Sequence, residues 1–327
     1  MREAHPETII DPLLRSHVMT KPSRFWLSSL LCLSTLGLAV SDGWTAETFA
    51  LKQTPGTTAK YQREQKTDQV LTIAGMDIET KSSSFAMLSY TAGEKAADES
   101  LEVTERYDVL QSELSIVGMT YQFDSANPDQ APPAGFEPVA NIMRATFQTP
   151  VTTVYAGDGS VREVKIPAEK LSNIDPMFAE LFNVDRRKKS ASQQREMLPK
   201  KAVDVGDTWE QTIDAELGGG QTLTFGLKYE YTGPVQENGR TLQRVQVRHT
   251  SVAYRMDPNS PSPLKITDSE LTVKETEGEL FFDNARGVIV REGSKVVIEG
   301  TLKLLAGGQE LPGKLALTLS SKNVLQP

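Results

Sequence analysis

His249 is the first residue to consider for chemistry, because the other histidines, His5 and His17, precede an apolar N-terminal stretch. Serine-based hydrolysis needs a base, usually histidine, within hydrogen-bond reach of the nucleophile, so His249 is the sole candidate. It lies an even number of residues from Val245 and Val247 along one predicted strand, so all three side chains point to the same face. This position predicts a packed, hydrogen-bonded core residue rather than a catalyst.

Carboxylates are the remaining acid–base option. Asp207 and Glu210 flank Trp209, an arrangement that a sugar-cleaving enzyme could use. That chemistry depends on the separation of the two carboxylates in space, which a sequence does not give. We favour the simpler interpretation, in which residues 206–207 form a turn and Trp209 anchors the strand that follows. A hydrolase that uses acidic residues stays the least favoured of our hypotheses, and we predict no catalytic residue.

Metal and cofactor sites also lack a signature. Asp124, Asn127 and Asp129 supply oxygen ligands in a loop, but the spacing lacks the glycine and terminal glutamate of a calcium-binding helix–loop–helix. The glycine run 218–220 lacks the lysine and hydroxyl residue of a phosphate-binding loop. Cys32 is the only cysteine, so thiolate metal sites and disulfides are excluded once its segment is removed. We predict no metal and no cofactor.

The acidic balance excludes one class of partner. The formal net charge is −8, so the nonspecific attraction to phosphate that supports most nucleic-acid binding is missing. The basic run 186–189 is the local exception, and we predict that it forms the solvated face of a helix.

Residues 25–40 have the layout of a secretory signal. They form an uncharged, leucine-rich stretch that follows Lys21 and Arg24 and precedes small residues. The stretch is shorter than the roughly 20 apolar residues that span a bilayer, so we expect removal and no stable transmembrane anchor. We predict a signal peptide over residues 1–41, with cleavage after Ala46 as the alternative and Met19 as a possible true start. The protein would be exported, to the periplasm or the extracellular space.

Residues 42–327 read as a single β-rich domain, because hydrophobic residues recur at every second position. One-sided strands of this kind predict an antiparallel sheet. The alternation is found at Leu223, Phe225, Leu227, Tyr229 and Tyr231; at Leu101, Val103, Tyr107 and Val109; at Leu271 and Val273; at Val296, Ile298, Leu302 and Leu304; and at Leu315, Leu317 and Leu319.

Short turn sequences predict that consecutive strands are neighbours. Asp158-Gly159, Asn238-Gly239 and Gly307-Gly308 each separate two alternating runs. Proline-rich loops are expected at 125–138 and 257–263.

Helical periodicity is confined to an insert at about 167–197. Pro176 suits a helix start, and an apolar stripe follows it through Val184. A second, more polar helix is expected from Asp185 to Met197, ending before Pro199. The predicted fold is therefore mainly β (α+β): a large curved antiparallel sheet or half-barrel with a short helical segment packed on it.

Residues 48–325 resemble a family of exported bacterial proteins that carry a domain-of-unknown-function label. The resemblance rests on residues 121–125, 157–161, 198–209 and 278–283 together with Gly287. It implies export and a β-rich fold, and no activity. More loosely, the pattern is similar to the half-barrel of periplasmic lipoprotein carriers, in which a sheet wraps a helix and leaves an apolar groove. Such likeness in fold does not imply function.

Our leading hypothesis is a noncatalytic exported binding protein or cell-envelope-associated protein. A lipophilic ligand would lie in a groove between the sheet and the helix, and the candidate groove residues are Met177, Phe178, Leu181, Phe182, Phe225, Leu227, Tyr229 and His249. The alternative is a structural or protein-interaction domain of the envelope, whose partner would be an envelope protein.

Overall fold

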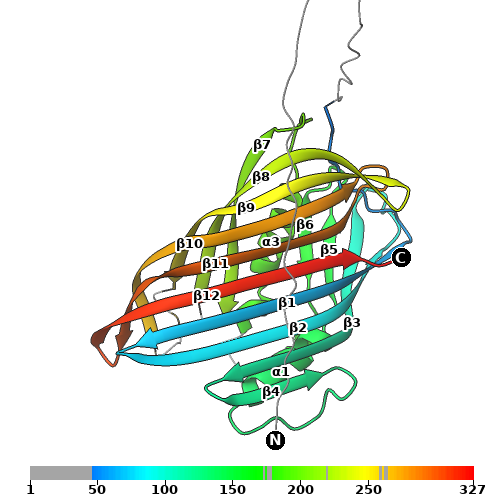
Figure 1. The fold of residues 1–327 in the computed structure, drawn as a ribbon. Coiled ribbons are helices and arrows are strands. Elements are labelled where there is room, and N and C mark those ends of the chain that lie inside the picture. The colour runs from blue at the N-terminus through cyan, green and yellow to red at the C-terminus, as the bar shows by residue number, and fades with distance from the viewer. Residues whose placement is uncertain (1–45, 172–173, 175–178, 219, 258–259, 261–263) are drawn as a thin grey trace, which may run out of the picture. The chain divides into compact units, whose positions relative to one another are not determined.

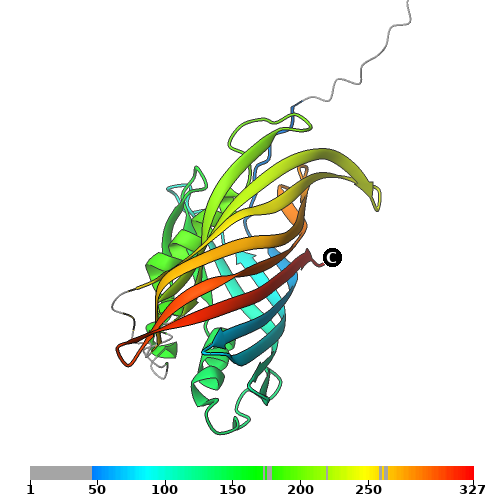
Figure 2. The same ribbon diagram turned by 60° about the vertical axis from the view of Figure 1, so that its left-hand side comes forward.

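A computed structural model describes residues 46–171, 174, 179–218, 220–257, 260 and 264–327. These residues lie in one compact unit and form a 12-stranded antiparallel sheet with helices on its inner side (Figures 1 and 2). The strands are β1 (Thr58–Ile73), β2 (Met76–Ala92), β3 (Leu101–Ile116), β4 (Met119–Asp124), β5 (Val151–Tyr155), β6 (Val161–Lys165), β7 (Thr208–Gly218), β8 (Gln221–Glu237), β9 (Arg240–Met256), β10 (Leu264–Asp283), β11 (Val288–Ala306) and β12 (Gln309–Leu325). The predicted curved antiparallel sheet is confirmed.

The order of strands is β6-β5-β3-β2-β1-β12-β11-β10-β9-β8-β7, with β4 paired to β3. Most neighbours are consecutive in the chain, as the turn sequences predict. The exception of greatest consequence is the pairing of the first strand with the last, which runs from Tyr61 opposite Leu325 to Ile73 opposite Gly313. In Figure 1 blue β1 lies beside red β12, so this ladder joins the two halves of the sheet.

The predicted hairpins are confirmed. Asp158-Gly159 joins β5 to β6, Asn238-Gly239 joins β8 to β9, and Gly307-Gly308 joins β11 to β12. Asn238 has φ +49° and Gly239 has φ +74°. Positive φ at both central residues is the requirement of the tight hairpin turn that Asn-Gly favours.

A bulge in β3 corrects the predicted face of Val109. Leu88 of β2 pairs with Tyr107, but the preceding Met87 pairs with Val109, so β3 has one extra residue there. An extra residue shifts the alternation of all residues beyond it. Tyr107 therefore stays on the inner face with Leu88, whereas Val109 turns outward and Leu110 takes the inner position, where it is buried.

Helix α1 (Glu137–Gln148) was missed, since helical structure was expected only at 167–197. The proline-rich loop predicted up to residue 138 ends at Phe136, because Pro138 occupies the first turn of the helix. Proline is tolerated there, since the first N–H groups of a helix have no intrahelical partner. The buried residues Ala140, Ile142 and Ala145 form the face that packs against the sheet.

Helix α3 (Val184–Glu196) confirms the predicted polar helix. Its N-cap Asn183 accepts hydrogen bonds from the backbone N–H groups of Asp185 and Arg186, at 2.9 and 3.2 Å. This is the side-chain capping that asparagine provides at a helix start. Two short 3-10 helices, η1 (Ala168–Lys170) and η2 (Glu180–Phe182), also lie in the predicted helical segment.

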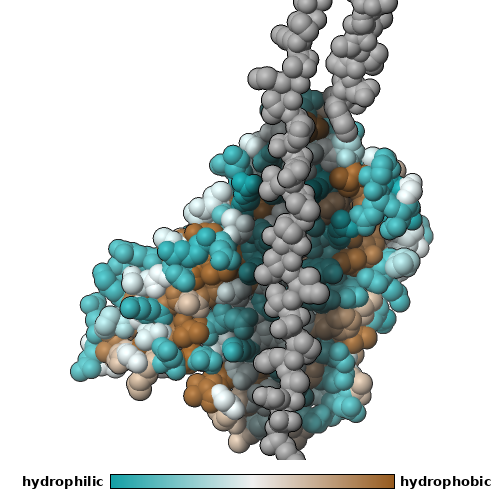
Figure 3. Space-filling view, viewed as in Figure 1, coloured by the Kyte–Doolittle hydropathy of each residue, from teal (hydrophilic) through white to brown (hydrophobic). Residues whose placement is uncertain are grey.

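The inner face of the sheet carries two larger apolar clusters and a small third one formed by Ala92, Leu101 and Val103. The large cluster joins inward residues of β8 to β12 with Phe49, Leu198 and Val203. The α1 cluster joins Phe136 and Ala140 to inward residues of β2, β3 and β4: Ala86, Leu88, Leu110, Tyr121 and Phe123. The surface visible in Figure 3, seen from the same side as Figure 1, intersperses hydrophilic and hydrophobic residues. Because the apolar clusters lie on the inner face, the sheet keeps most of its core on that face, as the alternation of its strands predicts.

The predicted signal peptide lies outside the described residues and stays a prediction, as does the division into a signal peptide and a single domain. Among the described residues, helices long and apolar enough to span a bilayer are not found.

Replacement of Leu304 tests the position of the core. Leu304 is fully buried in the large cluster, whereas Leu217 on edge strand β7 is 47% exposed. We expect Leu304→Ala to lower the free energy of unfolding by about 2–5 kcal/mol, because the truncation leaves a cavity in packed surroundings. Leu217→Ala should change it by no more than about 0.5 kcal/mol. Urea unfolding followed by circular dichroism measures both, and equal losses would contradict this assignment of the core.

Candidate functional site

The structure separates the predicted groove residues into different surroundings. Met177 and Phe178 lie outside the described residues. Leu181 is half-buried and Phe182 is buried, and their short helix η2 contacts α3 and β7. The groove predicted between this segment and the sheet therefore stays a prediction.

Phe225, Leu227 and Tyr229 come together on the inner face of β8. All three belong to the large cluster and are at most 6% exposed. Trp209 of β7 stacks on Tyr229 with ring centroids 5.4 Å apart, and its indole N–H donates to the Met197 carbonyl at 2.9 Å. These side chains are packed against protein.

His249 lies beside them on β9. Its ring meets that of Phe225 edge to face at 5.3 Å, and its Nδ1 lies 3.2 Å from the Thr276 hydroxyl. Burial lowers the pKa of His249, so its neutral form is favoured. Its surroundings are those predicted for a packed, hydrogen-bonded histidine.

The acidic residues weighed in the sequence have structural contacts. Asp207 accepts a hydrogen bond from the backbone N–H of Asp204 at 2.9 Å, which closes the turn before β7. Asp124 accepts from the backbone N–H of Ala126 at 2.9 Å. Within the described part of the chain, groups of three or more histidine, cysteine or acidic side chains placed to hold a metal ion are not found.

A polar cluster lies between the two larger apolar clusters on the inner face. We call it the Arg63 cluster, and it comprises Arg63, Tyr90, Glu105, Tyr107, Glu292 and Asn323. Strand register aligns three of its members, because Glu292 of β11 pairs with Asn323 of β12, which pairs with Arg63 of β1. This line continues to buried Leu280 on one side and buried Ala86 on the other. The charged side chains of Glu292 and Arg63 thus lie in a row of paired residues that is apolar at both ends.

Hydrogen bonds connect the members of the Arg63 cluster. Arg63 donates from Nη2 to the Tyr90 hydroxyl at 3.1 Å, and Asn323 donates from Nδ2 to Glu292 Oε1 at 3.3 Å. The rings of Tyr90 and Tyr107 also pack against the α1 cluster. Each tyrosine therefore has its ring against apolar residues while its hydroxyl faces Arg63 or its neighbours.

Burial dominates the electrostatics of the carboxylic and phenolic groups. It raises the pKa of Glu292, although the hydrogen bond from Asn323 and the charge of Arg63 act to lower it. Burial also raises the pKa of Tyr90 and Tyr107, with Glu105 adding to the effect. For Arg63, burial acts to lower the pKa, but the nearby tyrosines and glutamates outweigh it and the pKa is raised. Arg63 is thus a permanent cation beside hydroxyl groups that stay protonated.

Helix α3 brings a second arginine to this cluster. The charges of both Arg63 and Arg187 act on the Tyr107 hydroxyl, where they oppose the effect of burial on its pKa. The guanidinium of Arg187 also lies over the Phe182 ring, 6.0 Å from its centroid. The cluster therefore combines groups from the sheet and from the helix.

Contacts with both edge strands hold α3 in place. On the β7 side, Lys189 pairs with Asp214, and Arg186 pairs with Glu216 at 3.1 Å. On the other side the guanidinium of Arg195 lies 5.0 Å from the Tyr155 ring centroid in β5. The prediction that residues 186–189 form a solvated face holds only for Lys188 and Lys189, which are exposed, whereas Arg186 and Arg187 are half-buried, because successive helix residues point in different directions.

Two polar atoms near the cluster are buried without a partner. Among the described residues, Oδ1 of Asn323 and Nε of Arg187 make no hydrogen bond. An unpaired buried polar atom costs about 1–3 kcal/mol. Together with charged groups in an apolar setting, this is typical of a site that binds something rather than of a stabilising core.

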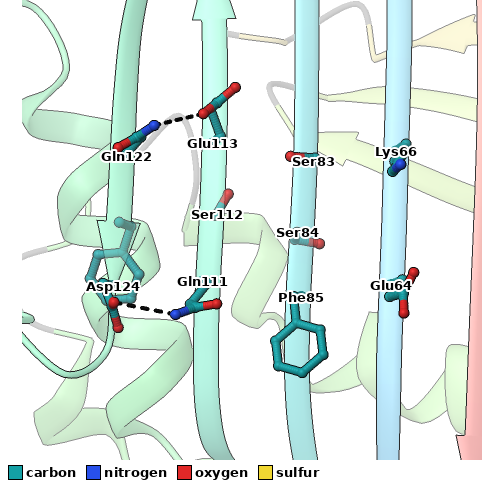
Figure 4. Close-up of a pocket in the computed structure, with 11 residues that line it drawn as sticks. Glu64, Lys66, Ser83, Ser84, Phe85, Gln111, Ser112, Glu113, Gln122 and Asp124 are labelled. Carbon is teal, nitrogen blue, oxygen red and sulfur yellow. Dashed lines mark hydrogen bonds between the residues drawn. The ribbon is translucent and has the colours of Figure 1, made fainter.

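The outer face has a different kind of hollow, of about 470 Å³ (Figure 4). Its polar side chains bond to each other across the strands: Gln122 donates to Glu113 at 2.7 Å, and Gln111 donates to Asp124 at 3.3 Å. Most of its lining is polar, and four of these polar side chains are paired with each other, so we consider this hollow a poorer site for a lipophilic ligand than the Arg63 cluster.

Comparisons with known proteins add little. No family model matches the chain, and no curated protein matches it. A structure described as lipid–protein interactions in lipovitellin is 11% identical, with a TM-score of 0.46 over 84% of this chain and 26% of the other. This chain therefore spans about a quarter of that lipovitellin chain.

Two further solved structures match more weakly. The translocator domain of the autotransporter NalP from Neisseria meningitidis is 9% identical, with a TM-score of 0.17 over 86% of this chain and 91% of the other. A DUF1329 family protein from Desulfovibrio piger is 8% identical, with a TM-score of 0.12 over 78% and 83%. At these TM-scores the likenesses carry no argument, and the resemblance to an exported family stays a prediction.

Sequence reasoning missed the Arg63 cluster, although one signal was present. Glu292 is in phase with Val296 and Ile298, and Glu105 is in phase with Val103, so each is a carboxylate at an apolar position of its strand. Charged residues are almost never fully buried unless paired, so such positions mark a candidate site. No comparable signal predicts that the two strands meet through β12 and β1.

Replacement of Glu292 tests the electrostatic environment. A raised pKa means that the folded chain holds the proton more tightly, so wild-type stability falls as pH rises from the ordinary value of 4.5 through the folded value. Glu292→Gln does not titrate and should gain stability relative to wild type across this interval, with no gain below pH 4.5. Thermal unfolding at a series of pH values measures the difference. The exposed neighbour Glu299→Gln is the control, and a gain that grows toward low pH would contradict the assignment.

Proposed function

We propose that this protein is an exported, noncatalytic binding protein that holds a lipophilic ligand on the inner face of its sheet. One observation carries the proposal: Tyr90 and Tyr107 join an apolar cluster to a cluster of charged and unpaired polar groups. A ligand site of this kind is mostly apolar, with a few polar groups that fix the orientation of the ligand. All members of the Arg63 cluster keep part of their surface accessible, so a ligand can reach them.

Half-buried apolar side chains border the polar groups and suit the apolar part of such a ligand. Val139 and Met143 of α1 and Leu114 of β3 pack against the α1 cluster without being fully buried. On the other side, Leu319 of β12 borders the large cluster in the same way. The ligand would lie between these residues, with its polar end toward Arg63.

A structural or protein-interaction domain of the envelope is the second candidate. The tight packing of Phe225, Leu227 and Tyr229 favours it, because fully buried side chains leave no room for a ligand beside β8. The two functions differ in whether the purified protein carries a small molecule.

Analysis of the bound molecule separates the two candidates. We expect the protein, purified from an envelope fraction without detergent, to release a lipophile into organic solvent, detected by mass spectrometry. Leu88→Gln places an amide against the α1 cluster and should reduce the amount recovered, whereas Leu217→Gln on the exposed edge should not. Release of no lipophile, together with no thermal stabilisation by added fatty acid, would favour the structural domain.

Export predicts a new N-terminus. When the full chain is expressed in a bacterium with a secretory system, we expect mature protein in the exported fraction that begins at Asp42. Cleavage should require the leucine-rich stretch, so Leu30→Arg should retain the full-length chain in the cytoplasm. Mass spectrometry of the intact protein identifies the cleavage site, and full-length wild-type chain in the cytoplasm would contradict export.

A further inference from the structure

Two arginines from different elements act on the polar end of the proposed ligand site. Arg63 extends from β1 and Arg187 from α3, and the charges of both act on the Tyr107 hydroxyl. Arginine presents a planar fork of N–H donors that matches carboxylate and phosphate oxygens. Within the described residues, the buried Nε of Arg187 has no hydrogen-bond partner. A donor of this fork is therefore left for an acceptor that the described residues do not provide.

Tyrosine hydroxyls lie at the same place. Tyr90 accepts from Arg63 and is also hydrogen-bonded to the Glu105 carboxylate, whereas Tyr107 accepts from Arg63. Tyr61, on the same face of β1, donates to the Ile289 carbonyl at 3.1 Å, and its ring meets that of Tyr90 at 5.6 Å. Burial raises the pKa of Tyr61 to about 12, so its hydroxyl stays uncharged at neutral pH and does not repel an anion.

The carboxylates of the cluster only partly neutralise the arginines. Asn323 already donates to Glu292, and burial favours the uncharged form of Glu292. The second carboxylate, that of Glu105, is hydrogen-bonded to Tyr90 and raises the pKa of Tyr90, Tyr107 and Arg63. An added anion would therefore meet more positive than negative charge at Arg63 and Arg187.

We propose that the Arg63 cluster binds the anionic head group, carboxylate or phosphate, of an amphiphile whose apolar chain lies against the α1 cluster. This inference rests on the proposed function and adds the chemical class of the ligand. Arg63 and Arg187 hold the oxygens of the head group, the Tyr107 hydroxyl donates a hydrogen bond to it, and the rings of Tyr90 and Tyr107 lead into the apolar cluster. The basic run of α3 thus has one member that serves the site while its neighbours attach the helix to β7.

Matched probes test the head group. We expect the purified mature protein to bind palmitate at least tenfold more tightly than 1-hexadecanol in isothermal titration calorimetry, because the alcohol lacks the charge. Lysophosphatidic acid should bind in the same way as palmitate. Acetate and inorganic phosphate carry the anionic group without the long apolar chain of the amphiphile, so they should not bind at millimolar concentration.

Variants locate the binding of the acid. Arg63→Met and Arg187→Met should each weaken palmitate about tenfold to a hundredfold, the range for loss of one hydrogen bond to a charged group, and leave 1-hexadecanol unchanged. Arg63→Lys keeps the positive charge but loses the planar fork of donors, so its affinity for palmitate should lie between those of wild type and Arg63→Met. Arg248→Met removes an exposed arginine elsewhere on the sheet and should change neither probe. Should Arg63→Met fail to fold, Arg187→Met on the helix supplies the same test.

The outcomes separate this inference from the proposed function. Equal binding of palmitate and 1-hexadecanol, with no effect of the arginine variants, would overturn the anionic head group and leave a lipophile-binding protein. Binding of phosphate alone, lost in the same variants, would show a free-anion site and overturn the amphiphile. Failure of every chain-bearing probe to bind would overturn the proposed function together with this inference.

Discussion

The pairing of β1 with β12 is the interaction on which the rest of the structure depends. It joins a sheet half built from β2 to β6 to one built from β7 to β11, through a ladder from Tyr61 opposite Leu325 to Ile73 opposite Gly313. Register within this ladder decides which side chains meet, because a slip of one residue would turn every side chain of a strand to the other face. The same pairing joins the strands that are farthest apart in the chain. The chain must lose the entropy of closing this long loop before the contacts between the two strands can form.

The charged residues on the inner face are difficult to explain as stabilising elements. Burial of an ion pair often costs as much as its Coulomb attraction returns, so well-packed apolar residues would serve stability equally well. Here the charged line lies between two clusters that are already apolar, with Leu280 on one side and Ala86 on the other. The proposed binding role of Arg63 would account for this placement, and the tyrosines explain how polar groups can border an apolar cluster.

Helix α3 connects the two edges of the sheet and the site. An exposed sheet edge has unpaired backbone groups, and covering it with a helix is one way in which proteins protect it. The ion pairs of Arg186 and Lys189 attach the helix to β7, although partly exposed pairs of this kind contribute little stability each. Their value lies in fixing the helix, because the residue between them, Arg187, then acts with its charge on the Tyr107 hydroxyl.

Several features could be predicted from local sequence. The alternation of Phe225, Leu227 and Tyr229 predicts a one-sided strand, and Asn238-Gly239 predicts the hairpin after it, because both depend on residues close in the chain. The helix over 185–197 follows from polar composition and the stop at Pro199 in the same way. Local pattern was insufficient for α1, where proline residues predicted a loop, and for Val109, where a bulge reversed the face.

The candidate site shows where sequence reasoning stops. Glu292 and Glu105 can be recognised one by one as carboxylates in an apolar phase, but Arg63 gives no such signal among its polar neighbours on β1. The sequence by itself determined the strands, their inner faces and the polar helix, since these rest on periodicity and on short-range capping. Only the tertiary structure decided that Arg63, Arg187 and Glu292 share one site, because the long-range β1–β12 register and the attachment of α3 to both edge strands bring them together.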